Sequence, residues 1–182
     1  MTELDTLRKG IVSLLDGMWW ALRDSVGALS MYEGYSGGFK QMGSEFAEGI
    51  GDRGANGAAK MAADLFAAIG LDVEREGKVV LVKSCPIWSR ILERGLEYAF
   101  HIEEICWKPM LEGIGEKAGA RPVIESSLRM AHLERARLNH RKGKARAALE
   151  KGEISKKDYE ARVASLEESL QQIPSQGHYR FE

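Results

Sequence analysis

The spacing of apolar residues predicts a long first helix. Leucine, isoleucine, methionine and valine recur at steps of three and four residues from Leu4 to Leu29, which is the repeat of one helix face. Gly10, Gly17 and Gly27 interrupt this stretch, and each disfavours a helix by about 1 kcal/mol relative to alanine. Further helices are expected over about 30–49 and over 57–69.

The middle of the chain has the pattern of a β-hairpin. Residues 71–74 alternate between apolar and acidic side chains, and residues 78–83 are rich in valine. The turn pair Glu76-Gly77 lies between the two segments. A short helix or a loop is expected over 87–95 and a further helix over 102–117, and Pro109 inside the latter predicts a kink near 105–107 or a later start. A third strand is predicted over 122–127 and a last one over 177–182.

Between the third and the last strand the pattern becomes helical and strongly charged. Residues 128–150 and 155–173 predict two helices joined by a turn, and apolar residues of the second form a packing seam. The order of elements predicts an α+β fold: an antiparallel sheet backed by helices, with a helical hairpin inserted before the last strand. We expect residues 1–127 and 174–182 to form an α+β ligand-binding domain and residues 128–173 to form the insertion.

Composition and charge narrow the function classes. Of 182 residues, 44% are hydrophobic and 29% are charged, so the chain can build a core. The net charge of −1 does not indicate a protein that acts through a strong charge excess. The basic run within 128–150 lacks interleaved aromatic residues, so we interpret it as a solvated helix face and do not expect nucleic acid as a partner. The sequence has no apolar run long enough for a membrane span and no signal-peptide pattern, so we expect no membrane and a cytoplasmic location.

Two cysteines carry most of the candidate chemistry. P-loop, HExxH and GxSxG motifs are absent, as is GxGxxG after a predicted strand. Glu103 lies one helical turn before Cys106, so both side chains can face Cys85. Together with a further histidine these three residues could hold zinc or iron. Two alternatives stay open: buried structural thiols, or a nucleophile, which would need a cationic or histidine neighbour.

Short motifs along the chain resemble a known family. They cover about 30–127 and 176–182 and are Tyr32-Glu33-Gly34-Tyr35-Ser36-Gly37-Gly38, Ser84-Cys85-Pro86-Ile87-Trp88, Gly95-Leu96-Glu97, Glu103-Glu104-Ile105-Cys106, Leu111-Glu112-Gly113-Ile114 and Gly177-His178-Tyr179-Arg180-Phe181. This set resembles the 4-vinyl-reductase-like domain superfamily, in the branch that includes proteins like L-2-amino-thiazoline-4-carboxylic acid hydrolase. The resemblance implies a small-molecule-binding module with an apolar or mixed pocket, often homodimeric and sometimes with a cysteine-held metal. Tyr179 stands where the family often has a cysteine.

Aromatic residues suggest where a ligand would bind. Aromatic-lined pockets take flat or apolar molecules, although the same rings can simply fill a core. We expect a pocket lined by Tyr35, Phe39, Trp88 and Trp107. The sequence thus favours a small-molecule-binding or sensor module that forms a homodimer. The alternative is a metal- or thiol-assisted hydrolase of a small molecule, for which no catalytic residue is identified.

Overall fold

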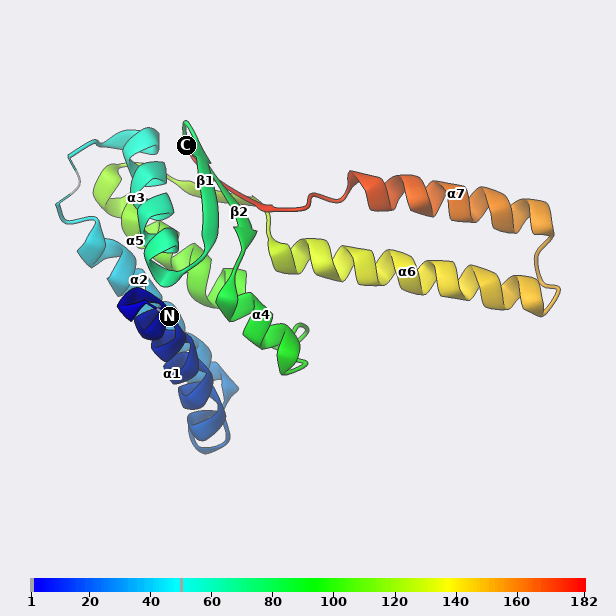
Figure 1. Ribbon diagram of the computed structural model, residues 1–182, viewed down its shortest axis with the longest axis horizontal. Coiled ribbons are helices and arrows are strands. Elements are labelled where there is room, and N and C mark those ends of the chain that lie inside the picture. Colours follow the sequence, from blue (N-terminus) through cyan, green and yellow to red (C-terminus); the bar gives the residue numbers. More distant parts are fainter. Residues whose placement is uncertain (1, 50) are drawn as a thin grey trace. The chain divides into compact units, whose positions relative to one another are not determined.

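The computed structural model describes residues 2–49 and 51–182 and confirms the α+β fold (Figure 1). Residues 1 and 50, which belong to the predicted α+β domain, lie outside the described residues. In chain order the elements are α1 (Glu3–Val26), α2 (Ala28–Phe46), α3 (Gly54–Ile69), β1 (Asp72–Glu76), β2 (Val79–Ser84), α4 (Pro86–Glu93), the π-helix η1 (Glu103–Trp107), α5 (Lys108–Ala118), β3 (Pro122–Ser126), α6 (Leu128–Glu150), α7 (Lys156–Gln172) and β4 (Gly177–Phe181).

The four strands form one antiparallel sheet in the order β1-β2-β4-β3. The last strand is therefore central: Tyr179 pairs with Val80 of β2 on one side and with Ile124 of β3 on the other. The chain leaves β3, forms α6 and α7, and returns as the hydrogen-bonded neighbour of β3. This register confirms that the helical hairpin is inserted between two adjacent strands.

The described chain divides into two compact units. One contains the residues up to Leu128 together with Gln176–Glu182, and the other is Arg129–Ser175. The first unit holds the whole sheet and all helices from α1 to α5, and the second holds α7 and nearly all of α6. None of the helices in the described part of the chain combines the length and the apolar character that crossing a membrane requires.

The core of the larger unit forms where helices cover the sheet. α3 contacts β1, β2 and β4, while α5 contacts β3. Along strand β4, buried residues alternate with partly exposed ones, because successive side chains point to opposite faces of the sheet. Tyr179 and Phe181 are among the buried ones. A chain of edge-to-face rings joins helices to sheet: Phe39 contacts Trp107, Trp107 contacts Phe66, and Phe66 contacts Tyr179, with ring centroids 5.2–5.7 Å apart.

Glycines let α2 and α5 pack backbone to backbone. A β-carbon at Gly43 would lie 2.0 Å from the carbonyl oxygen of Met110, and one at Gly113 would lie 2.3 Å from that of Lys40. Both distances are far inside van der Waals contact, so neither position can hold a side chain unless the helices separate. This crossing fixes α2 against the core and so places the residues of α2 that face α1.

Three boundaries differ from the sequence-based prediction or refine it. The predicted first helix breaks at Gly27, whose φ of +84° is a conformation that favours glycine, and the chain continues as α2. The third helix begins at Gly54 rather than at residue 57. The irregularity predicted from Pro109 is confirmed: η1 is a π-helix that ends at Trp107, and Pro109 lies in the first turn of α5, where it needs no hydrogen-bond donor.

The smaller unit is a two-helix hairpin. The turn uses Gly152 at a φ of +73°, and the side chain of Ser155 caps α7 by accepting a hydrogen bond from the Asp158 amide. Leu138 of α6 and Leu166 of α7 are buried. The Lys142 ammonium lies 2.6 Å from the Glu167 carboxylate across the hairpin. Charge pairs of this kind agree with the interpretation of the basic run as a solvated, paired helix face.

Candidate ligand-binding cavity

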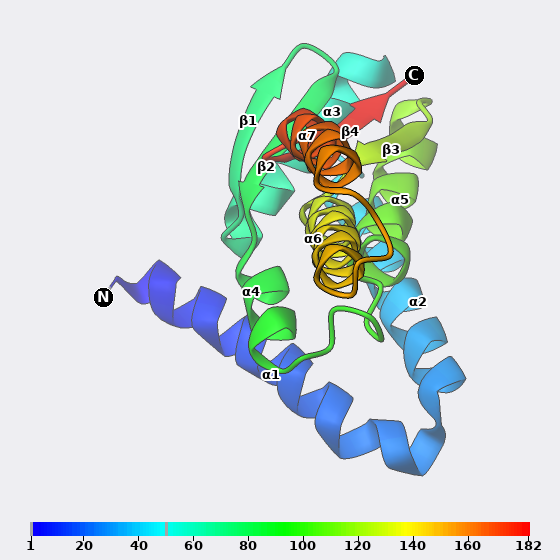
Figure 2. The same cartoon turned by 90° about the vertical axis from the view of Figure 1, so that its right-hand side faces the viewer.

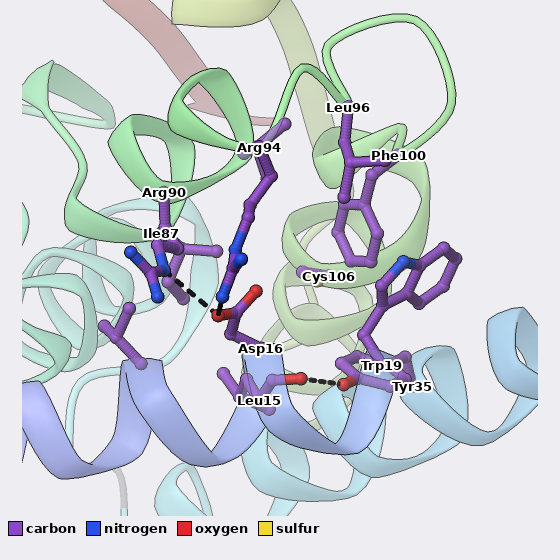
Figure 3. Close-up of a pocket in the computed structure, with 12 residues that line it drawn as sticks. Leu15, Asp16, Trp19, Tyr35, Ile87, Arg90, Arg94, Leu96, Phe100 and Cys106 are labelled. Atoms are coloured by element: carbon purple, nitrogen blue, oxygen red, sulfur yellow. Dashed lines mark hydrogen bonds and ion pairs between the residues drawn. The ribbon is translucent and has the colours of Figure 1, made fainter. Parts of the chain in front are cut away.

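A small cavity lies inside the larger unit, between α1, α2, α4, the segment 95–101 and η1 (Figure 3). Its volume is about 40 Å³, which is room for about three water molecules. The lining is mostly apolar. It includes Val12, Leu15, Trp19, Tyr35, Ile87, Ile91, Leu96, Phe100 and Cys106. Residues more than 60 positions apart in the sequence thus line one cavity.

Three rings form the wall of the cavity. The ring centroids of Trp19 and Phe100 are 4.8 Å apart at an interplanar angle of 80°, and Tyr35 lies edge-on to both at about 6 Å. The Tyr35 hydroxyl donates a hydrogen bond to the carbonyl oxygen of Leu15, which ties α2 to α1. Burial raises the pKa of Tyr35 to about 12, so its hydroxyl stays protonated. The wall is therefore a neutral aromatic surface held by cross-helix contacts.

Trp19 contributes a polar group that the fold leaves unused. Its side chain is 6% exposed, and its Nε1–H is buried without a hydrogen-bond partner in residues 2–49 and 51–182. Figure 3 shows the indole beside Phe100, with the nitrogen turned toward that ring. A buried donor left unpaired costs about 1–3 kcal/mol, so such groups normally have a partner. Trp19 is also one of the residues that line the cavity.

Charged residues meet at the rim of the cavity. Asp16 of α1 accepts hydrogen bonds from Arg90 (3.0 Å) and Arg94 (2.9 Å) at the α4 end, and from the indole nitrogen of Trp20 (3.1 Å). Burial opposes ionisation of Asp16, but the hydrogen bonds from Arg94 and Arg90 outweigh it and lower its pKa. Two guanidinium groups therefore share the Asp16 carboxylate, and Arg90 also pairs with the carboxylate of Glu93 at 2.9 Å.

The two cysteines lie in the core rather than on a surface. Cys85 caps α4, because its sulfur accepts a hydrogen bond from the Trp88 amide at 3.3 Å. Burial raises the pKa of Cys85 to about 12, and burial with the nearby Cys85 and Glu103 raises that of Cys106 well above its ordinary value. Both thiols are therefore protonated at neutral pH, which weakens them as nucleophiles.

The third predicted metal ligand, Glu103, is also buried. Its carboxylate accepts a hydrogen bond from the Ser127 hydroxyl, and it interacts electrostatically with Cys85 and Cys106. The structure thus brings the three predicted residues near one another. Within the described ranges, however, no group of three or more histidine, cysteine, aspartate or glutamate side chains is arranged to hold a metal ion. The zinc or iron site remains a prediction.

The four aromatic residues predicted to line a pocket lie in different places. Tyr35 lines the cavity, and Phe39 lines a separate groove on the outer side of α2. Trp107 is packed between Phe39 and Phe66 in the core, and Trp88 is buried in α4. Neither tryptophan lines the cavity.

Sequence reasoning did not assign Trp19, Phe100 or the rim residues to the site. Arg90 and Arg94 are one helical turn apart, which is a readable signal for two charges on one helix face. Their meeting with Asp16, more than 70 residues earlier, depends on the packing of α1 against α4. No spacing in the sequence could reveal that contact.

The outer groove lies between α1 and α2 and has a volume of about 440 Å³. Its lining is apolar and includes Ile11, Met18 and Leu22 of α1 and Phe39 of α2. Leu15, Tyr35 and Ile87 line both the groove and the inner cavity. One layer of side chains thus separates the two spaces.

Comparisons with known proteins give no relative: no protein-family model matches the chain, and no curated protein or solved structure matches it. The resemblance to the 4-vinyl-reductase-like superfamily therefore stays a prediction from short motifs. Any function must be argued from the geometry described above.

Proposed function

We propose that the protein is a small-molecule-binding or sensor module that acts in the cytoplasm and uses the inner cavity as its binding site. The single observation that carries this proposal is the unpaired indole N–H of Trp19, buried in an aromatic cavity. A bound acceptor group would remove the penalty of that buried donor. The apolar lining would contribute the rest of the affinity.

The size of the cavity and the charge at its rim restrict the ligand. Small-molecule sites usually have volumes of about 300–1,000 Å³, so a cavity of about 40 Å³ holds the end of a ligand rather than a whole one. Arg94 at the rim favours an anionic group, since it shares the carboxylate of Asp16 with Arg90, which also pairs with Glu93. We therefore propose a small aromatic or aliphatic carboxylate, or a similar acid, as the ligand class.

The alternative, a hydrolase assisted by a thiol or a metal, has less support. Cys106 does line the cavity, but burial, together with its neighbours Cys85 and Glu103, raises its pKa instead of lowering it. A catalytic thiol needs a cationic or histidine neighbour that stabilises the thiolate. The buried surroundings of Cys106 therefore fit a binding wall better than a nucleophile.

Native mass spectrometry of protein purified from its own host tests the proposal directly, because it reports bound ligand, metal and subunit number together. Benzoate serves as a defined probe, with toluene as the matched molecule that lacks an acceptor. We expect calorimetry to show benzoate binding and a roughly tenfold loss of affinity in Trp19→Phe, which keeps a ring but removes the N–H. Trp88→Phe is the control, since Trp88 is buried outside the cavity.

Three results would contradict the proposal: host-purified protein without a small molecule, no benzoate binding to the wild type, or equal affinity in Trp19→Phe. Hydrolysis of a probe ester that depends on Cys106 would instead support the hydrolase. Stoichiometric zinc or iron that is lost in Cys85→Ser and Cys106→Ser would support a metal site.

A further inference from the structure

Helix α1 exposes an apolar face that the fold does not use. Its buried side is centred on Trp19, with Val12 and Leu15 packed against the core. The adjacent face carries large aliphatic side chains, each between 39% and 65% exposed: Leu4, Leu7, Ile11, Leu14, Met18, Leu22 and Val26. Contiguous apolar patches on monomeric proteins rarely exceed a few hundred square ångströms, so a stripe along a whole 24-residue helix indicates a binding surface.

We propose that this face of α1, with the groove between α1 and α2, binds a second copy of this chain as an antiparallel helix pair. The proposal extends the homodimer expected from the sequence. The seven residues of the exposed stripe do not line the inner cavity, although Leu15, Tyr35 and Ile87 line both the groove and the cavity, so separate variants test the two proposals.

The spacing of the stripe is that of a helix–helix seam. Leu4, Leu7, Ile11, Leu14 and Met18 alternate steps of three and four residues, which is the a/d pattern of two packed helices. Because the buried side of α1 already uses other positions, the seam is left for a partner outside the described chain.

Glycines beside the stripe support a close helix contact. Gly10 and Gly17 lie inside α1, and Gly34 and Gly38 lie inside α2, where glycine disfavours the helix. A β-carbon at any of these four positions would meet no atom within 4 Å, so the fold itself does not require them. Gly34 and Gly38 line the groove. Small residues on a helix surface let another helix approach closely, as Gly43 and Gly113 do inside this core.

Residues of the stripe pair with one another when the helix is reversed, which favours a second copy as the partner. In an antiparallel pair with its two-fold axis between residues 16 and 17, Leu7 meets Val26 of the second copy and Ile11 meets Leu22, while at the centre Met18 meets Leu15, a partly buried residue that lines the groove. A two-fold interface requires this self-complementarity, and an unrelated partner does not. The arrangement also opposes the two helix dipoles.

The charges of α1 argue against a membrane as the occupant. Arg8, Lys9 and Arg23 are balanced by Glu3, Asp5, Asp16 and Asp24. A helix that lies on an anionic membrane normally has a strongly basic polar face, which α1 lacks.

The available surface approaches the size that a stable dimer needs. Helices α1 and α2 contain 24 and 19 residues, and they diverge from the turn at Gly27 (Figure 2). Helix α1 alone presents about 36 Å of helix, about 10 Å wide, or roughly 360 Å² in projection, and its groove with α2 adds to this. A standard interface buries about 800 Å² of accessible surface per partner. Accessible area exceeds projected area, so the face approaches the size of a standard interface.

The first experiment measures the oligomeric state by sedimentation equilibrium. We expect a wild-type dimer and, in Leu7→Glu/Leu14→Glu, a dissociation constant raised about 100-fold or more, because a two-fold interface presents each change twice. Both side chains are exposed, so circular dichroism of the variant should be unchanged. Leu92→Glu, an exposed leucine on α4, is the matched control and should remain dimeric.

Cross-linking tests the antiparallel arrangement. Cysteines at position 18 of the two copies would lie about 10 Å apart, from a three-residue offset and a typical helix separation. Cysteines at position 4 would lie about 37 Å apart. A bismaleimide that spans about 10 Å should therefore join Met18→Cys to itself and leave Leu4→Cys unlinked. The native Cys85 and Cys106 are buried and should not react.

A wild type that is monomeric at every concentration, or a dimer that Leu7→Glu/Leu14→Glu leaves intact, would overturn the proposal. Efficient cross-linking of Leu4→Cys would overturn the antiparallel arrangement. A monomeric wild type that binds anionic lipid vesicles would assign the face to a membrane instead. Benzoate binding by the monomeric variant would show that the cavity works without the dimer, so its loss and the loss of the dimer are separate results.

Discussion

The crossing of α2 and α5 gives a sharp test of the fold. In Gly113→Ala the new β-carbon would lie 2.3 Å from the carbonyl oxygen of Lys40 and 2.8 Å from the amide nitrogen of Ser44, so the two helices must separate by about 1 Å. Overpacking of this kind costs about 1–3 kcal/mol, at the upper end here because the opposing atoms are backbone. The higher helix propensity of alanine offsets about 1 kcal/mol of this cost. We expect a net loss of about 2 kcal/mol in the free energy of unfolding.

Urea unfolding followed by circular dichroism measures this loss. With a slope of about 1–3 kcal/mol per molar urea, the midpoint should fall by about 1 M. Gly37→Ala is the matched control: Gly37 lies inside α2, the other helix of the crossing, but a β-carbon there meets nothing within 4 Å, so we expect stabilisation by about 0.5–1 kcal/mol. Equal stability of Gly113→Ala and the wild type would refute the close helix contact described here.

Two further predictions concern titratable groups. The pKa of Asp16 is lowered in the folded protein, so its stabilisation is present above the unfolded pKa of about 4 and is lost as the pH falls through the folded value. The difference in melting temperature between wild type and Asp16→Asn should therefore be largest near neutral pH and vanish in acid, and a difference that persists there would contradict the ion pairs. Because burial raises the pKa of Cys85 to about 12, a disulfide reagent at pH 8 should modify the native thiol at least about 10³-fold more slowly than the unfolded one. Comparable rates would place the thiol at the surface.

Much of the fold follows from local patterns. The valine-rich run predicted β2. The change to a helical and strongly charged pattern after Ser127 predicted the helical hairpin before the last strand. Pro109 predicted the irregular turn at η1, because its missing N–H has only a few tolerated places. Gly27 shows the limit of periodicity. The apolar repeat runs through it, and only the backbone conformation reveals that α1 ends there.

The site was harder to predict than the fold. Tyr35 lines the cavity, whereas Trp88 and Trp107 are packed outside its lining, because periodicity identifies buried rings without telling which of them border a space. The contacts of Asp16 with Arg90 and Arg94 join α1 to α4, and such long-range pairs leave no local signal. The role of Cys85 as a helix cap also depends on local geometry rather than on residue type.

The shared wall between cavity and groove links the two proposals. Leu15, Tyr35 and Ile87 face the cavity on one side and the groove on the other, so a second copy seated in the groove would restrict the side chains that a ligand contacts. Thermodynamic linkage requires any such effect to be reciprocal. If the dimer binds benzoate more tightly than the monomeric Leu7→Glu/Leu14→Glu variant does, benzoate must strengthen dimerisation to the extent set by that difference in affinity. Sedimentation equilibrium with and without benzoate measures that factor. Equal benzoate affinities in monomer and dimer would show instead that the wall is rigid and that the two surfaces act independently.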